Sequence, residues 1–186
     1  SIGSGKTTVA KLFSKHWYNR IDADEIGHEI LKKNSIAYKK TLKEFGKEIL
    51  DKNKNIDRKK LGNIVFNNPA KLKKLNSITH PIITKKIKNQ IKKIKQKCGD
   101  NARIIVDASL LLETKKKDLV DKIIVIKAGK SSVIERLTEK FPKERIEKIL
   151  NTQMKPDEKL KHADFVIEND EKKLVLFLED LVCSLQ

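Results

Sequence analysis

The sequence predicts an α/β fold in which helices cover both faces of a parallel sheet. Three observations predict it. The chain opens with a glycine-rich phosphate-binding loop that runs straight into a helix. Short β-branched runs then alternate with helical patterns, as in a parallel sheet with helical crossovers. Residues 35–99 show helical patterns only, which predicts a helical insertion in a three-layer α/β/α P-loop domain.

The opening stretch, Ser-Ile-Gly-Ser-Gly-Lys-Thr-Thr, is most of a phosphate-binding loop. Its glycines allow a tight backbone whose N–H groups surround a phosphate, and the dipole of the next helix adds positive potential. Lys6 is predicted to reach the β/γ-phosphates of ATP, and the Thr7 hydroxyl to bind Mg²⁺ between two phosphate oxygens. The ATP-binding loop is predicted to comprise Gly3, Ser4, Gly5, Lys6, Thr7 and Thr8.

The loop motif normally begins with a further glycine, which follows an apolar strand. Both would precede Ser1. We therefore expect a first strand of the sheet that is missing from this sequence, and a natural chain that begins several residues upstream.

Length and composition fit one globular domain of 186 residues, with 38% hydrophobic and 36% charged residues. No apolar run approaches the ~20 residues that span a bilayer, and no signal peptide is evident, so we expect a cytoplasmic protein without a membrane partner. The two cysteines have no metal-ligand spacing. The sequence does not indicate an oligomeric state.

The net charge of +17 raises the alternative of nucleic-acid binding. The lysines are spread along nearly every helix, however, and aromatic residues that could stack on bases amount to 5%. We therefore interpret most of this charge as solvated helix surface, and nucleic acid is not the expected partner.

After the loop, the patterns predict a helix over 6–15, a strand over 19–22 and a second helix entered at Asp22-Ala23-Asp24. Two carboxylates thus follow the strand at its carboxyl end, where ligands of open α/β sheets bind. Asp24 is the candidate general base or acceptor-orienting residue, and its alternative role is a helix N-cap. Asp22 could instead hold metal-bound water, and the spacing does not distinguish the two.

The helical middle stretch begins with a helix whose apolar side is predicted to include Ile36, Leu42 and Phe45, and continues with a helix capped by Asp57. Pro69 then restarts a helix, and His80-Pro81 starts the longest one. His80 is expected at that helix start, as a cap or a packed ring. The core-facing stripe of the longest helix is predicted to consist of Ile83, Ile87, Ile91 and Ile94.

The second half alternates strands and helices again. Asp107, after a buried strand over 103–107, either assists Mg²⁺ through water or caps the next turn. A cation-rich helix pair over about 136–153, with Arg136 and Lys140, could form a lid that closes over the phosphates. The alternative is a solvated charged hairpin. The remaining predicted elements are a strand over 122–126, helices over 131–140 and 143–153, a strand over 165–167 and a helix over 171–184.

Taken together, these residues resemble the dephospho-coenzyme A kinase family over nearly the whole chain. An Asp-Ala-Asp segment combined with an Asn-x-x-x-His-Pro segment at this separation is more specific than the loop alone. The residues that carry the resemblance are 2–8, 21–24, 58–61, 64–66, 75–76, 79–82, 110–113, 136–137, Gln153, 163–167 and Asn169.

The resemblance implies transfer of the γ-phosphoryl group of ATP to the ribose 3′-hydroxyl of dephospho-CoA, the last step of coenzyme A biosynthesis. It implies a five-stranded parallel core over about 1–34 and 100–186, a helical acceptor-binding insertion over about 35–99 and a lid. Asp24 would be the base, Asn169 would lie near the adenine, and the acceptor side would include Asp22, Asp24, His80, Leu110 and Leu111.

The chain also departs from the family pattern. His28, Ser109 and Lys140 stand where the family usually has arginine, proline and arginine. The alternatives to this kinase are a nucleoside-monophosphate or other small-molecule kinase, a basic P-loop protein that binds nucleic acid, and an inactive relative.

Overall fold

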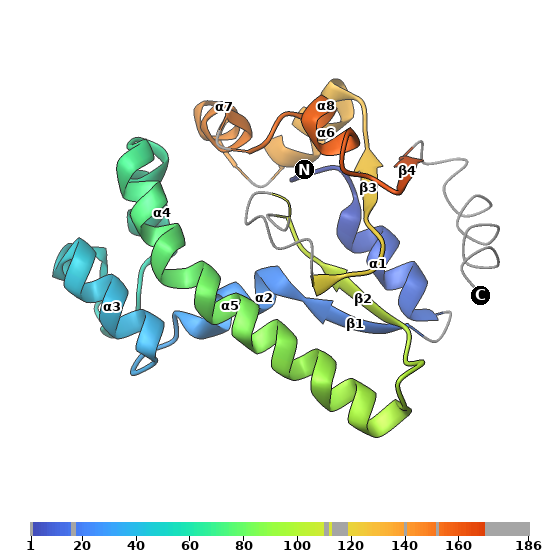
Figure 1. The fold of residues 1–186 in the computed structure, drawn as a ribbon. Coiled ribbons are helices and arrows are strands. Elements are labelled where there is room, and N and C mark those ends of the chain that lie inside the picture. The colour runs from blue at the N-terminus through green and yellow to red at the C-terminus, as the bar shows by residue number, and fades with distance from the viewer. Residues whose placement is uncertain are drawn as a thin grey trace. The chain divides into compact units, whose positions relative to one another are not determined.

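The fold is a mixture of helices and parallel strands, as predicted, in a computed structural model (Figure 1). It describes residues 2–15, 18–109, 112, 119–139, 141–151 and 153–169, with the backbone alone at 143–145. The helix predicted over 171–184 lies outside these residues. The strands are β1 (Asn19–Asp22), β2 (Ile104–Asp107), β3 (Ile124–Lys127) and β4 (Phe165–Glu168). The helices are α1 (Lys6–Lys15), α2 (Ala23–Ile30), α3 (Ile36–Phe45), α4 (Arg58–Phe66), α5 (Pro69–Cys98), α6 (Lys130–Thr138), α7 (Lys143–Asn151) and α8 (Pro156–Leu160), with a 3₁₀ turn at Lys47–Ile49.

The chain divides into two compact units, one of Ser1–Ile21 with Ile94–Gln186 and one of Asp22–Lys93. Each is described by itself. The second contains no β-strand between residues 35 and 93, as the helical patterns predicted. The expectation of a single domain with a core, an insertion and a lid stays a prediction.

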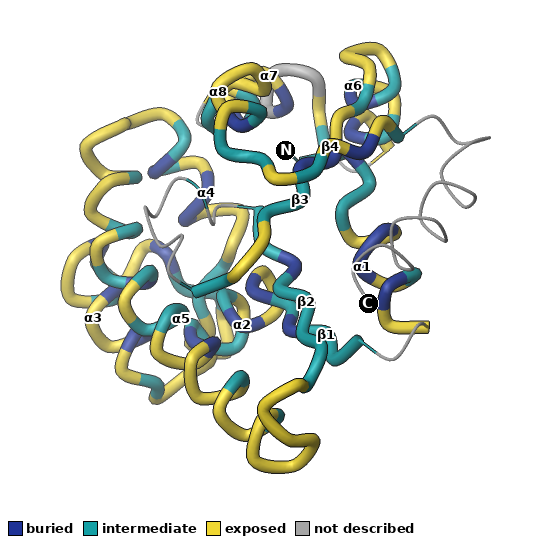
Figure 2. Tube along the Cα trace, turned by 45° about the vertical axis from the view of Figure 1, so that its right-hand side comes forward, coloured by how far each residue is buried: buried dark blue, intermediate teal, exposed yellow. Residues whose placement is uncertain are grey.

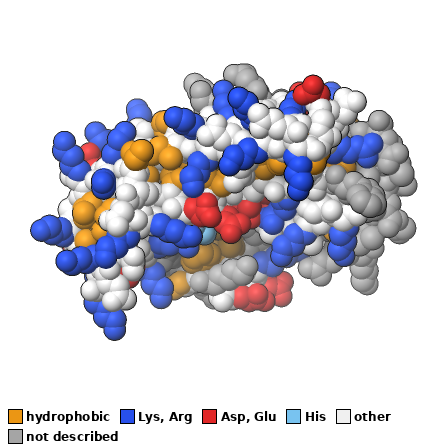
Figure 3. All heavy atoms as spheres, turned by 90° about the horizontal axis from the view of Figure 1, so that it is seen from below, with side chains coloured by type: hydrophobic (Ala, Val, Ile, Leu, Met, Phe, Trp, Pro, Cys, Tyr) orange, Lys and Arg blue, Asp and Glu red, His pale blue; other side chains and the backbone are white. Residues whose placement is uncertain are grey.

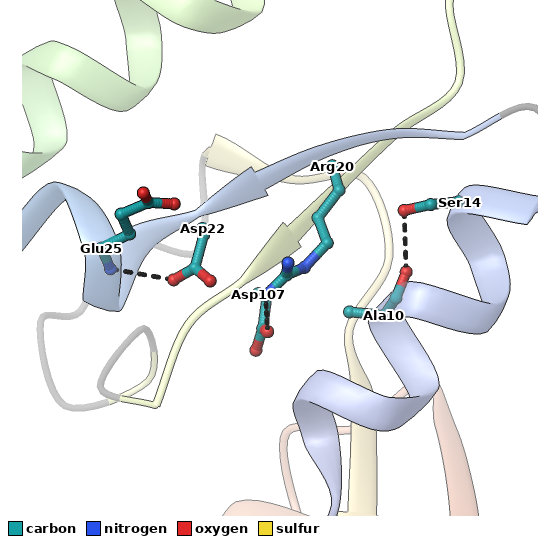
Figure 4. A network of polar contacts seen from close by, with 6 residues as sticks. All are labelled: Ala10, Ser14, Arg20, Asp22, Glu25 and Asp107. Carbon is teal, nitrogen blue, oxygen red and sulfur yellow. Dashed lines mark hydrogen bonds and ion pairs between the residues drawn. The ribbon is translucent and has the colours of Figure 1, made fainter.

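The strands of the first unit form two pairs, β1 with β2 and β3 with β4. The second pair is parallel, with Ile124 opposite Phe165, and the arrows of β1 and β2 point the same way in Figure 4. Helix α1 buries Val9 and Phe13 against Ile126 and Ile167. This cluster fixes α1 against β3 and β4, and α1 begins directly after the phosphate-binding loop. The cluster therefore also fixes the end of the loop.

Strand β2 is less buried than its sequence suggests. A fully buried strand was expected over 103–107, but Asp107 alone is buried and the three apolar residues before it are half-buried. Within the described residues β2 pairs only with β1, so its other edge is not covered by a strand there. The three-layer arrangement and the additional first strand stay predictions.

The second unit has a core of Phe45, Ile49, Leu61 and Val65, joined by Leu72, Leu75 and Ile78 of α5. The predicted cap of α4 is confirmed, because Asp57 Oδ1 accepts hydrogen bonds from the backbone N–H groups of Lys59 (2.8 Å) and Lys60 (3.2 Å). Ile36, expected on the core side of α3, is 69% exposed. Phe45 is buried as predicted, and the other buried residues of α3 are Ala37, Tyr38 and Thr41.

Helix α5 corrects the boundary predicted at His80-Pro81. A single helix of 30 residues runs through Pro81, although an interior proline costs about 3 kcal/mol. Leu75 and Ile78 pack in the core before the proline, and Ile87 is buried after it. This packing on both sides offsets the cost of the proline. The isoleucine stripe is confirmed: Ile87 is buried, Ile83, Ile91 and Ile94 are half-buried, and the intervening lysines are exposed (Figure 2).

Candidate functional site

The phosphate-binding loop has the backbone that its glycines predicted. Gly3 and Gly5 lie in the left-handed region, with φ of +76° and +88°. A Cβ on Gly5 would come within 2.1 Å of Asn169 Nδ2. Both the conformation and the space therefore require glycine at position 5.

Side chains from distant parts of the sequence hold the loop. Asn169 Nδ2, after β4, donates to the carbonyl oxygen of Ser4 (2.8 Å), and Arg136 Nη1, on α6, donates to that of Gly3 (3.2 Å). Gln153 Oε1 accepts from the backbone N–H of Ile2 (3.0 Å). The first two bonds use loop carbonyls, whereas phosphate binding uses loop N–H groups, so the two are compatible.

The residues after Gly5 form the first turn of α1, with the backbone N–H of Val9 donating to Gly5 O (3.1 Å). Lys6 is half-buried, while Thr7 and Thr8 are exposed. The first turn contains no acidic residue that would oppose the positive end of the helix. Anion binding is the chemistry that this arrangement favours.

Helix α6 packs directly beside the loop. A Cβ on Gly3 would lie 3.2 Å from side-chain atoms of both Val133 and Leu137. These two residues pack with Ile146 of α7, and Ile2 of the loop packs against the same cluster. Lys140, the second predicted lid cation, lies outside the described residues.

Asp107 makes an ion pair that the sequence reading did not anticipate. Arg20 Nη2 on β1 donates to Asp107 Oδ2 at the end of β2 over 2.8 Å (Figure 4). The Asp107 side chain is only 4% exposed, and that of Arg20 21%. One feature of the sequence could have indicated this ion pair: Arg20 lies inside a predicted strand, and buried cations in proteins are usually paired with an anion.

The cap of α2 is Asp22, not Asp24. Asp22 Oδ1 accepts a 2.9 Å hydrogen bond from the backbone N–H of Glu25, as Figure 4 shows. The extended backbone of Asp22 brings its carboxylate to the exposed N–H groups of the first turn. Asp24 lies within that turn and is exposed.

His28 lies one turn after Asp24 and contacts a residue of another helix. Arg58 Nη2, at the start of α4, is hydrogen-bonded to His28 Nε2. Partial burial, followed by the Arg58 charge, lowers the pKa of His28 below 6.5. The carboxylates of Asp24, Asp22 and Glu25 act in the opposite direction and raise this pKa, but by less. The ring is therefore neutral near pH 7, and its Nε2 accepts a hydrogen bond from the Arg58 guanidinium.

His80 lies inside α5 rather than at a helix start, and it is half-buried. Leu110 and Leu111 fall outside the described residues. The structure thus brings Gly3, Ser4, Arg136 and Asn169 together in one unit, and it places Asp22, Asp24 and His80 in the other. The Asp24 and His80 assignments stay predictions.

The described residues were also considered as ligands of a metal ion and as membrane-spanning helices. Among the described residues, no group of three or more His, Cys, Asp or Glu side chains is arranged to hold a metal ion. None of the helices in the described part of the chain combines the length and apolarity of a membrane crossing.

Comparisons with known proteins agree on one family. The profile of the dephospho-CoA kinase family matches residues 1–174. A dephospho-CoA kinase of Fusobacterium nucleatum is 42% identical over 182 residues, which are 97% of this chain and 89% of the relative. One from Aquifex aeolicus is 39% identical, over 91% of this chain and 85% of the relative.

Two solved structures are also similar. The dephospho-CoA kinase from Campylobacter jejuni superposes with a TM-score of 0.70 at 33% identity, covering 100% of this chain and 93% of that one. A protein from Thermus thermophilus has a TM-score of 0.78 at 23% identity, over 100% of this chain and 94% of that one, which supports the fold alone.

Proposed function

We propose roles for the site residues of this chain, which belongs to the dephospho-CoA kinase family and phosphorylates dephospho-CoA on a hydroxyl group in coenzyme A biosynthesis. ATP is the phosphoryl donor of such a kinase. The acceptor atom that we propose is the oxygen of the ribose 3′-hydroxyl. The alternatives of a nucleoside-monophosphate kinase and an inactive relative become outcomes of the test below.

The loop geometry is the observation that carries the proposal. Left-handed glycines at 3 and 5, carbonyls bound by Arg136 and Asn169, and a helix that begins at Lys6 together suit a triphosphate. In this proposal Lys6 neutralises charge on the transferring phosphoryl group, and Gly3, Ser4, Gly5, Thr7 and Thr8 supply the remaining loop contacts. Asn169 would lie beside the adenine as well as the loop.

Asp24 is the proposed general base. Asp22 is occupied as the cap of α2 through its bond to Glu25 N–H, whereas Asp24 is exposed one position into the helix. In the transfer, the Asp24 carboxylate accepts the proton of the acceptor hydroxyl while that oxygen attacks the γ-phosphorus and the bond to the ADP oxygen breaks. We propose that Asp22, His80, Leu110 and Leu111 line the acceptor side.

Mg²⁺ is proposed to accompany ATP. The donor set fits it in part: Thr7 offers an exposed hydroxyl, a hard oxygen ligand, while Asp107 shares its carboxylate with Arg20. The ion would neutralise charge on the β- and γ-phosphates. Asp107 would act on it through water, which is one of the two roles expected from the sequence.

We also propose a three-layer core and a mobile lid over about 136–153. The apolar contact of Leu137 with Ile146 joins α6 to α7 within the proposed lid. Arg136 and Lys140 would then be the lid cations. The Arg136 bond to Gly3 O ties the base of this lid to the loop.

A coupled assay of ADP release tests the function. Dephospho-CoA should stimulate release strongly, whereas AMP, CMP and no acceptor should leave it near background. Stimulation by AMP or CMP instead would indicate a nucleoside-monophosphate kinase, and no stimulation by any acceptor would remove the proposal.

The alternative of nucleic-acid binding has no specific support from the face drawn in Figure 3. On that face the Lys and Arg side chains are scattered rather than gathered in a stripe.

A further inference from the structure

Arg58, at the start of α4, has no role so far, and its guanidinium contacts the helix that contains Asp24. Asp24 and His28 are four residues apart on α2, so they share one face of that helix. The Arg58 guanidinium bonds to the His28 ring, and the charges of both Arg58 and Asp24 act on that ring. A guanidinium and the proposed base therefore both lie near one imidazole.

The position of Arg58 is fixed by the start of its helix. It is the first residue of α4, and the Asp57 cap binds the next two backbone N–H groups. Its side chain is exposed although it is bonded to His28. A guanidinium has five N–H donors in a planar fork, and a single bond to imidazole leaves donors for a ligand.

The protonation state of His28 decides whether its ring can accept the hydrogen bond from Arg58. Burial and Arg58 lower its pKa, while Asp24, Asp22 and Glu25 on α2 act in the opposite direction. A neutral ring accepts an N–H bond from Arg58. An imidazolium cannot accept one, and it repels the guanidinium.

We propose that Arg58 is an acceptor-binding residue, held by His28 so that its guanidinium binds the diphosphate of dephospho-CoA beside Asp24. This inference rests on the proposed function. Arginine suits the task because its fork matches phosphate oxygens in pairs. His28 is then a positioning residue that acts through Arg58.

The competing explanation is that the pair only ties α2 to α4. Both explanations predict some loss of stability when Arg58 is removed, so stability does not separate them. The affinity for dephospho-CoA does, and so does its dependence on pH.

The test measures dephospho-CoA binding by calorimetry without ATP, together with KM for each substrate. Arg58→Ala should weaken acceptor binding about 10- to 100-fold, as expected for a bond to a charged group, and leave KM for ATP nearly unchanged. Arg58→Lys should give an intermediate loss, because it keeps the charge without the fork. The matched control is Lys59→Ala, which removes a neighbouring exposed cation and should leave acceptor binding unchanged.

His28 variants provide the second measurement. In the wild type, acceptor binding should weaken only as pH falls through the folded-state pKa of His28, which lies below its ordinary value, because the ring then gains its proton. His28→Gln keeps a hydrogen-bond acceptor without a titration, so its acceptor binding should be near wild type and lose that pH dependence. His28→Leu should weaken acceptor binding severalfold in the wild-type background. Added to Arg58→Ala, it should cause little further loss beyond that of Arg58→Ala alone.

The outcomes separate this inference from the function itself. If the wild type phosphorylates dephospho-CoA and Arg58→Ala binds it as tightly as Lys59→Ala does, the inference is overturned and the function stands. The same holds if the pH dependence persists in His28→Gln. If the wild type neither binds nor phosphorylates dephospho-CoA, the proposed function itself is contradicted, and the inference about Arg58 is overturned with it.

Discussion

The side-chain amide of Asn169 donates a 2.8 Å hydrogen bond to the carbonyl oxygen of Ser4, which joins the end of β4 to the phosphate-binding loop. The backbone N–H of Asn169 is itself bound to Lys127 O (2.7 Å). The loop is thereby attached to the β3–β4 pair as well as to α1. Its shape depends on residues more than a hundred positions away in the sequence.

Asn169→Ala should raise KM for ATP about fivefold, the value of one neutral hydrogen bond of about 1 kcal/mol. Asn169→Asp should do worse, because it sets a carboxylate oxygen against the Ser4 carbonyl. The neighbouring Glu168→Ala, which removes an exposed partner of Lys127, is the control and should leave KM for ATP unchanged. Steady-state kinetics checks all three, and an unchanged KM in Asn169→Ala would show that the bond does not support ATP binding.

Gly5→Ala should weaken ATP binding at least about tenfold, because the left-handed backbone costs about 1–2 kcal/mol and the new Cβ overlaps the Asn169 amide. Gly99→Ala is a matched control. Gly99 has a similar φ of +86° with no atom within 4 Å of the added Cβ, so it carries the backbone strain without the overlap. Calorimetric titration with ATP should show a loss in Gly5→Ala only, and equal binding in both variants would contradict this assignment.

Arg20→Met should lower the free energy of unfolding by about 3 kcal/mol, because it leaves the buried Asp107 carboxylate without its guanidinium. The double variant Arg20→Met with Asp107→Leu should recover much of that loss. Lys127→Met breaks an exposed ion pair with Glu168 and should change stability little. Denaturant unfolding measures all three, and a double variant no more stable than Arg20→Met alone would argue against an uncompensated buried charge.

His28 should make stability depend on pH. Its folded-state pKa lies below the unfolded value, so between the two the unfolded chain binds more protons and stability falls as pH drops through about 6.5. His28→Gln should remove this contribution. Unfolding curves from pH 5 to 8 check it, and a wild-type profile that is the same as that of His28→Gln would contradict it.

The sequence predicted the local structure well where a single pattern decides it. The α1 boundaries, the Asp57 cap and the isoleucine stripe of α5 follow from glycine conformation, capping and periodicity. Pro81 and Ile36 were misjudged because packing by distant residues outweighs local preference. Nothing in a one-dimensional pattern reports such packing.

The contacts of the candidate site residues could not be predicted from the sequence, and their roles stay predictions. The loop residues and Asn169 were named from the sequence, whereas the ion pair of Arg20 with Asp107 and the bond of Arg58 to His28 were not. Each joins residues about 30 or more positions apart, so only the fold reveals it. The spacing in the sequence did not distinguish the roles of Asp22 and Asp24. The structure shows that Asp22 caps α2, which favours Asp24 as the proposed base.

The most direct test of the whole account compares wild type, Asp24→Asn and Lys6→Ala in dephospho-CoA-dependent ADP release, with ATP binding measured on the same samples. The wild type should be active. Asp24→Asn should lose transfer and keep ATP binding, whereas Lys6→Ala should lose both. Transfer by Asp24→Asn at the wild-type rate would contradict the assignment of the base on which the account depends.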